Sequence, residues 1–311
     1  MIITLTVNPA VDQTLWVDHF RPGHVNRPTE VHLDPAGKGI NVSRMVHRLG
    51  RPTIALGFLG GDIGHLMQTA LQAERVQNHF VPIAGQTRIN VTIVDRTEGL
   101  SSNLYGPGPR VTAEELGELD EMLECWFKAG RVLVLAGSLL PGIPEDFYAR
   151  YIERARACGV KTILDADGPS LRQGIAAQPF LIKPNQTEAE HLLGRPLPRL
   201  EDVARGAREL SERGISVVVI SLGAAGAVCA YEGNLWHVLP PKVQLQSTVG
   251  SGDSLVAGMA VELADGGGVV AGLRLGTAAG AATALSAGTS LGTPEDVKRL
   301  LAEVQIKELQ I

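Results

Sequence analysis

The chain has 311 residues, of which 44% are hydrophobic and 20% are charged, and its formal net charge is −5. This length is enough for one large α/β domain or two smaller ones, and the composition is that of a soluble globular protein. The negative charge argues against a nucleic-acid-binding protein, because a phosphate backbone requires a basic face. It does not exclude a nucleotide, which a few local groups can hold.

The cysteine pattern indicates a reducing compartment. Cys125, Cys158 and Cys229 are isolated from one another and form no CxxC pair, which argues against a structural zinc site and a disulfide framework. The N-terminal residues resemble a strand rather than a signal peptide, and no apolar run approaches the ~20 residues that span a bilayer. We therefore expect a cytoplasmic protein without a membrane partner.

The first third of the chain predicts core strands interrupted by an accessory sheet. Residues 2–7 and 52–59 have the β-branched, apolar composition of core strands, and helices are expected at 40–49 and 63–73. The segments 15–17, 30–33, 86–94 and 101–105 are short or alternate between polar and apolar residues. We interpret them as a small accessory sheet inserted from about 13–35 and 86–106.

The remaining two thirds alternate regularly between helix and strand. Thr112 and Glu115 predict a capping box for a helix over 113–128, and a small-residue helix is expected at 272–287. Strands are expected at 131–136, 161–164, 180–182 and 217–220, and further helices before Cys158, at 188–193 and at 200–212. This pattern predicts an α/β fold with a doubly wound, mostly parallel sheet and helices on both faces, in one domain over 1–311.

The strongest chemical motif is Gly250-Ser251-Gly252-Asp253, which precedes an apolar helix. Glycines let the backbone approach a ligand closely, and the N–H groups at a helix start form an anion site. Asp253 would lie beside that anion as a proton acceptor. This pairing suits phosphoryl transfer, although an aspartate after Gly-Ser-Gly is also an ordinary helix N-cap.

Several further motifs occur in one characteristic order, and together they resemble the ribokinase-like (phosphofructokinase B) sugar kinases. They cover 8–12, 36–41, 87–90, 137–142, 183–188 and 221–226. Ala36 departs from the family pattern, which has glycine there. The resemblance implies that Asp253 is the catalytic base and that the backbone of Gly250, Ser251 and Gly252, with the N–H of Asp253, forms an anion hole.

The motifs resemble the 1-phosphofructokinase branch most closely, with tagatose-6-phosphate kinases and the minor 6-phosphofructokinase as neighbours. This implies ATP-dependent phosphorylation of fructose 1-phosphate at its free primary hydroxyl, giving fructose 1,6-bisphosphate. The two neighbouring activities remain alternatives, and a non-catalytic regulator on the same fold is a third. The intact Gly-x-Gly-Asp segment favours an active enzyme.

The resemblance assigns the sugar end to two cations and a set of polar residues. Lys38 and Arg88 would hold the substrate phosphate, a pair that a neutral sugar would not need. Arg88 and Asn90 could instead be the solvent face of a strand. Arg27 would add a third cation, across a homodimer formed through the accessory sheet. The other substrate-binding residues implied are Asp12, Gly37, Gly39, Asn41 and Ser138.

The same resemblance implies ATP and Mg²⁺ as cofactors. Glu188 and Asn185 would lie near Mg²⁺, through water, because this ion keeps several waters and needs few carboxylates. Read alone, the 183–188 segment is equally a helix N-cap. The nucleotide-binding residues implied are Lys183, Asn185, Ser221, Gly223, Gly226, Thr248 and Ser286.

Overall fold

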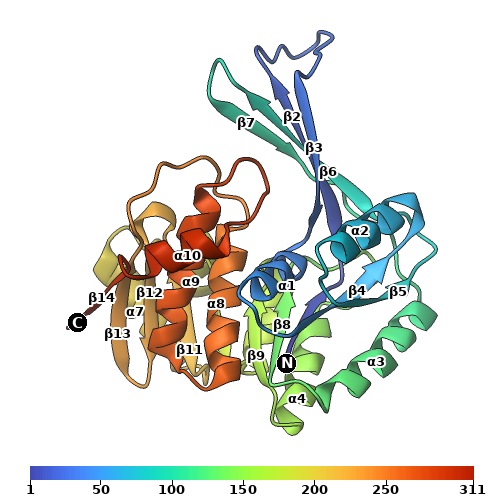
Figure 1. The fold of residues 1–311 in the computed structure, drawn as a ribbon. Coiled ribbons are helices and arrows are strands. Elements are labelled where there is room, and N and C mark those ends of the chain that lie inside the picture. Colours follow the sequence, from blue (N-terminus) through green and yellow to red (C-terminus); the bar gives the residue numbers. More distant parts are fainter.

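The computed structural model describes residues 1–311 and contains two β-sheets (Figure 1). The main sheet has ten strands in the order β14-β13-β12-β11-β10-β9-β8-β1-β4-β5. These strands are β1 (Ile2–Thr6), β4 (Thr53–Leu59), β5 (Asn78–Pro82), β8 (Val132–Ala136), β9 (Lys161–Asp165), β10 (Leu181–Ile182), β11 (Val217–Ser221), β12 (Ala227–Tyr231), β13 (Asn234–Leu239) and β14 (Gln305–Glu308).

The main sheet is parallel from β5 through β11 and antiparallel from β11 to β14. The ten α-helices are α1 (Lys38–Arg48), α2 (Gly61–Ala73), α3 (Ala113–Phe127), α4 (Phe147–Ala157), α5 (Gly168–Ala176), α6 (Gln186–Leu193), α7 (Leu200–Ser211), α8 (Ser251–Asp265), α9 (Val269–Ala284) and α10 (Pro294–Leu301). None of these helices combines the length and the hydropathy that crossing a membrane requires.

The alternation of strand side chains divides the core into two layers. Leu133 and Leu135 of β8 belong to a cluster with α3, α4, α5, α6 and α7, whereas Val132 and Val134 belong to a cluster with α1, α8, α9 and α10. Successive residues of a strand point to opposite faces, so both faces of the sheet are covered. The predicted doubly wound, mostly parallel sheet is confirmed.

Helices α8 and α9 pack closely because glycines face each other between them. A Cβ atom at Gly258 would overlap the backbone of Gly276. The predicted small-residue helix is therefore present, but it runs over Val269–Ala284, three residues earlier than expected. The capping box of α3 is also present, with Thr112 and Glu115 each accepting a hydrogen bond from the other's backbone N–H.

The second sheet, called the small sheet below, projects from the main body (Figure 1). Its strands are β3 (Glu30–Ala36), β2 (Ala10–Val17), β6 (Arg88–Asp95) and β7 (Leu100–Leu104), in that order. The register places Asp34 and Asn90 on either side of Asp12, which makes this face polar. The opposite face carries the exposed apolar residues Val31, Leu33, Ile89 and Leu104.

Candidate active site

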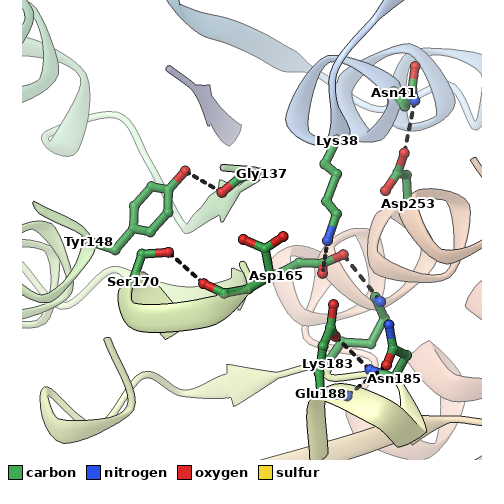
Figure 2. Close-up of polar contacts among 11 residues, drawn as sticks. Lys38, Asn41, Gly137, Tyr148, Asp165, Ser170, Lys183, Asn185, Glu188 and Asp253 are labelled. Carbon is green, nitrogen blue, oxygen red and sulfur yellow. Dashed lines mark hydrogen bonds and ion pairs between the residues drawn. The ribbon is translucent and has the colours of Figure 1, made fainter. Parts of the chain in front are cut away.

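Asp253 lies in the first turn of α8 and is almost completely buried, with 8% of its surface exposed. The side-chain amide of Asn41, in α1, donates a 2.8 Å hydrogen bond to Oδ2 of Asp253 (Figure 2). Burial raises the pKa of Asp253 to about 6, and the nearby charge of Asp165 acts in the same direction. The Asn41 hydrogen bond and the Lys38 and Lys183 ammonium groups oppose that increase.

The backbone at the start of α8 leaves three N–H groups without a hydrogen bond, those of Gly250, Gly252 and Asp253. Gly250 adopts a left-handed conformation with φ of 77°, which lets the chain turn into the helix. Ser251 N–H donates to Thr248 O at 3.3 Å, whereas no backbone hydrogen bond is formed by the N–H groups of Gly252 and Asp253. Within the helix the free donors are therefore Gly252 and Asp253, preceded by the Gly250 N–H, whereas the Ser251 N–H of the predicted anion hole is already bonded.

An ion-pair network joins β9, α1 and the loop after β10 beside this helix start. Asp165, at the carboxyl end of β9, is 2% exposed. Its Oδ1 accepts a 2.9 Å hydrogen bond from Nζ of Lys38, and Nζ of Lys183 lies 3.2 Å from its Oδ2 (Figure 2). A Cβ atom at Gly252 would lie only 3.3 Å from Nζ of Lys183, so the network is adjacent to the free N–H groups.

The charges in this network stabilise one another. Burial opposes ionisation of Asp165, but the Lys183 and Lys38 ammonium groups hold its pKa below the ordinary value. Burial likewise opposes the charge of Lys38, but the Asp165, Asp253 and Glu188 carboxylates raise its pKa above the ordinary value. The network therefore favours the charged forms of Asp165 and Lys38.

Asp165 is a functional candidate that the sequence motifs do not predict. Its sequence neighbourhood showed only the end of a strand, and no motif marked it. The available signal was its position, because the carboxyl ends of parallel strands are where open α/β sheets place their ligands.

Most of the uncharged residues predicted to bind the sugar, together with Asp12, lie where the small sheet meets the main sheet. Asn90 donates a 2.9 Å hydrogen bond to Asp12 Oδ1, and burial raises the pKa of Asp12 above its ordinary value. Ser138 Oγ accepts a hydrogen bond of 3.1 Å from Asn8. Gly37 and Gly39 flank the start of α1, where a Cβ atom at either residue would contact Thr6 of β1.

The three candidate cations of the sugar end lie in different places. Lys38 is paired with Asp165 in the network. Arg88 donates to the carbonyl oxygens of Gly106 at 2.6 Å and Asn8 at 3.1 Å, beside Asp12. Arg27 is exposed in the connection between β2 and β3. Figure 1 shows this connection at the end of the small sheet that is farthest from the main sheet.

The expected nucleotide residues lie along the loops that follow β10 and β11. Asn185 and Glu188 form a reciprocal capping box at the start of α6, with hydrogen bonds of 2.7 and 2.8 Å (Figure 2). The helix-cap interpretation of this segment is therefore correct as local structure. Ser221 N–H donates to Pro184 O at 3.0 Å, which ties the two loops together, and the turn Gly223–Ala225 ends at Gly226.

Thr248 precedes α8 in the sequence, and Ser286 follows α9. Thr248 lines a cavity of about 500 Å³ that opens between the small sheet and the loops before α8 and after α9. Ser286 precedes the Ala287, Gly288 and Thr289 lining of that cavity. No group of three or more His, Cys, Asp or Glu side chains is arranged to hold a metal ion.

A doubly wound sheet that presents a buried carboxylate, free helix N–H groups and paired lysines has the groups that a phosphotransferase needs. The profile of the pfkB family carbohydrate kinases matches residues 3–296. The chain belongs to this family and is an ATP-dependent sugar kinase.

Individual relatives agree with this assignment. The chain is 36% identical to 1-phosphofructokinase of Vibrio cholerae, over 99% of this chain and 97% of that protein. It is 34% identical to 1-phosphofructokinase of Bacillus subtilis, over 99% of this chain and all of that protein. Among solved structures, phosphofructokinase-2 from Escherichia coli in complex with substrates and products superimposes with a TM-score of 0.92 at 32% identity, covering 97% of this chain and 98% of that one. The predicted ribokinase-like fold is confirmed.

Proposed function

We propose that this chain transfers the γ-phosphoryl group of ATP to the free primary hydroxyl of fructose 1-phosphate. The hydroxyl oxygen forms the new bond to phosphorus, the bond between that phosphorus and ADP breaks, and the hydroxyl proton moves to Asp253. The products are fructose 1,6-bisphosphate and ADP. Relatives that share the name 1-phosphofructokinase support this substrate.

The observation that carries the proposal is the juxtaposition of the Asp253 carboxylate with the free N–H groups of Gly252 and Asp253 itself. A base with a pKa of about 6 is ionised at neutral pH and still accepts a proton readily. Free N–H donors beside it stabilise the charge that develops on the transferred group. Asn41 fixes one carboxylate oxygen and so orients the base.

The lysine network supplies positive charge next to these N–H groups. Lys38 and Lys183 are held together by one carboxylate, Asp165, so the three groups have a net charge of about +1 when ionised. Anionic phosphates bound here would find two ammonium groups already oriented, which reduces the cost of reorganisation during the reaction. We assign the phosphates of ATP to the loops at Lys183, Asn185, Ser221, Gly223 and Gly226, with Thr248 and Ser286 farther along the nucleotide.

The residues present fit a hydrated Mg²⁺ ion. Glu188 accepts a backbone hydrogen bond through one oxygen, Oε2, and lies close enough to Lys38 to affect its pKa. A single carboxylate and an amide oxygen suit an ion that keeps most of its waters and binds mainly to substrate phosphates. We propose that Glu188 and Asn185 hold Mg²⁺ through water, where the ion would neutralise phosphate charge.

Buried polar atoms without partners support a polyhydroxyl ligand at the sugar end. The atoms include Oδ1 of Asn8, Asn41 and Asn90 and Nε of Arg88, none of which has a hydrogen-bond partner within the chain. Buried polar groups are almost always paired in a complete structure. Sugar hydroxyls and a phosphate would pair them, with Asp12, Gly37, Gly39 and Ser138 forming the rest of the pocket and Arg88 and Lys38 facing the phosphate.

We further propose that the small sheet is the lid of one catalytic domain and the interface of a homodimer. Its apolar face exposes Leu33 by 51% and Leu104 by 58% of their surface, and several large apolar side chains exposed on one face favour an interaction site. Arg27 lies at the far end of the sheet, where a second copy could bring it to the partner's substrate. A cytoplasmic location remains a prediction from the cysteine pattern.

The test is an assay of ADP release with Mg²⁺-ATP and, in turn, fructose 1-phosphate, fructose 6-phosphate, tagatose 6-phosphate and free fructose. We expect kcat/KM for fructose 1-phosphate to exceed the others at least tenfold. If a 6-phosphate sugar is preferred, the proposed role of Asp253 stands but the proposed substrate is wrong. Turnover of none of them would overturn the proposed function.

A further inference from the structure

The loop that follows α9, residues 286–292, contacts the small sheet through a side-chain hydrogen bond. Thr289 is 6% exposed, and its Oγ1 donates to Oδ2 of Asp34 at 2.6 Å. Asp34 belongs to β3, where the register places it directly opposite Asp12. The hydrogen bond therefore connects this loop to the strand pair that carries a proposed sugar ligand.

A second contact lies one residue earlier in the same loop. Gly288 has a φ of 62°, and a Cβ atom there would lie 3.5 Å from the ring of Trp16 and 3.6 Å from Oγ1 of Thr14. The backbone of Gly288 thus packs against two residues of β2, on the same polar face of the small sheet as Asp34. Two consecutive loop residues therefore touch two neighbouring strands.

The other end of this loop is fixed against the start of α8. A Cβ atom at Gly250 would lie 3.0 Å from Cδ2 of Leu291. Arg48 of α1 donates from Nη1 to the carbonyl oxygens of Leu291 at 2.6 Å and Gly292 at 3.2 Å. Gly292 N–H donates to Oγ1 of Thr283, which also bonds Ser254 of α8.

We propose that Asp34 and Thr289 are positioning residues that couple the small sheet to the anion hole through the 286–292 loop. The inference rests on the proposed function, in which the sugar lies on the small sheet and the base and N–H donors lie on α8. The reacting groups are then held by two different parts of the fold, the small sheet and the start of α8. An error of about 1 Å between them can lower the rate about a hundredfold.

The hydrogen bond is suited to this role because it joins a carboxylate to an almost buried hydroxyl. Thr289 is the only hydrogen-bond partner of the Asp34 carboxylate. Leu291 packs directly against Gly250, the N-cap of the helix that carries Asp253, so a shift of the loop would also shift the start of that helix. Neither Asp34 nor Thr289 is assigned a contact with a reacting atom. Their effect on the reaction is therefore exerted through Trp16, Asp12 and the start of α8.

A double-mutant cycle tests the coupling. The variants are Thr289→Val, Asp34→Ala and the double variant, with Thr289→Ser as the conservative one. Thr97→Val is the matched control, because it removes an exposed hydrogen bond between the β6–β7 turn of the small sheet and the carbonyl oxygen of Asp18, and this bond involves neither the loop nor Trp16. Each is assayed for kcat and KM with the panel sugar that the wild-type chain turns over fastest, and for thermal stability.

We expect Thr289→Val and Asp34→Ala each to lower kcat about ten- to a hundredfold, with the KM for ATP unchanged and the double variant no worse than the single ones. Thr289→Ser and Thr97→Val should stay within about threefold of wild type. Folded single variants with full kcat, or losses that multiply in the double variant, would overturn the coupling. A wild-type chain that turns over no panel sugar would overturn the proposed function, and this inference with it.

Discussion

Asn41 and Asp253, 212 residues apart in the sequence, are joined by a 2.8 Å hydrogen bond between a side-chain amide and a carboxylate. Both residues are less than a tenth exposed, so the bond is protected from water. It links α1 to α8, and with them the proposed sugar site to the proposed base. Because Asn41 donates to the charged form of Asp253, it favours ionisation of a group that burial would otherwise keep protonated.

This relationship predicts the pH dependence of the reaction. The ionised carboxylate is the active form, so kcat/KM should fall about tenfold per pH unit below about pH 6, the pKa of Asp253. Asn41→Leu removes a hydrogen bond to the charged form and should move this acid limb to higher pH. A pH profile of kcat/KM for both proteins checks this, and an Asn41→Leu limb at lower pH would contradict the assignment.

Asp165 is predicted to be essential for stability, because it balances the charge of two lysines that we assign to bound phosphates. Asp165→Asn leaves Lys38 and Lys183 without their buried counter-charge, and breaking such a pair typically costs about 3–5 kcal/mol. Bound ATP phosphates would restore part of that counter-charge. We therefore expect a lower Tm that recovers more with saturating ATP in Asp165→Asn than in the wild type, measured by thermal melts at several ATP concentrations. Equal ATP-induced shifts in both proteins would argue against phosphate binding at these lysines.

The contact between α8 and α9 predicts that Gly258 tolerates no side chain. Gly258→Ala would force the backbones of the two helices apart and should lower the free energy of unfolding by about 1–3 kcal/mol or more. Gly117→Ala is the matched control, because Gly117 lies in α3 with open space around it, and alanine should stabilise that helix by up to about 1 kcal/mol. Urea denaturation of both variants separates the two outcomes, and a neutral Gly258→Ala would refute the close packing.

Arg88 is predicted to discriminate phosphorylated from free sugar. Arg88→Lys keeps the charge but loses the planar fork, which can bind a phosphate through two N–H groups while it also contacts Gly106 and Asn8. Losing a hydrogen bond to a charged group costs about 1.5–3 kcal/mol, a factor of roughly 10–150. We expect KM for fructose 1-phosphate to rise by about that factor while KM for ATP and kcat/KM for free fructose stay unchanged. An equal rise in the KM for free fructose would show that Arg88 does not act through the substrate phosphate.

The sequence predicted the parallel core of the fold and missed its edge. Strands such as β8 are continuous apolar runs, and their helices carry clear caps, so pattern alone identifies them. The strands β5 and β12–β14 lie at the two edges of the main sheet, where polar residues such as those of Gln305–Glu308 are tolerated and the apolar pattern is weak. Their pairing is decided by neighbours that are distant in the sequence.

The site was predicted where a motif is local and missed where it depends on the fold. The Gly250–Asp253 segment combines its glycines and carboxylate within four residues, so its chemistry is visible in the sequence. Asp165 becomes a site residue only because β9 lies between β8 and β10, next to two lysines from other elements. The pairing of Lys38 with Asp165 was hidden for the same reason.

Asp253→Asn tests the central claim most directly. The raised pKa means that the folded chain binds this proton more tightly than the unfolded chain, so the group's stabilising contribution is lost as pH rises through about 6. The uncharged variant should therefore be at least as stable as the wild type at neutral pH. Its kcat with saturating ATP and fructose 1-phosphate should fall by about 10²–10⁴. A folded Asp253→Asn protein that retains more than a tenth of wild-type kcat would show that Asp253 is not the base.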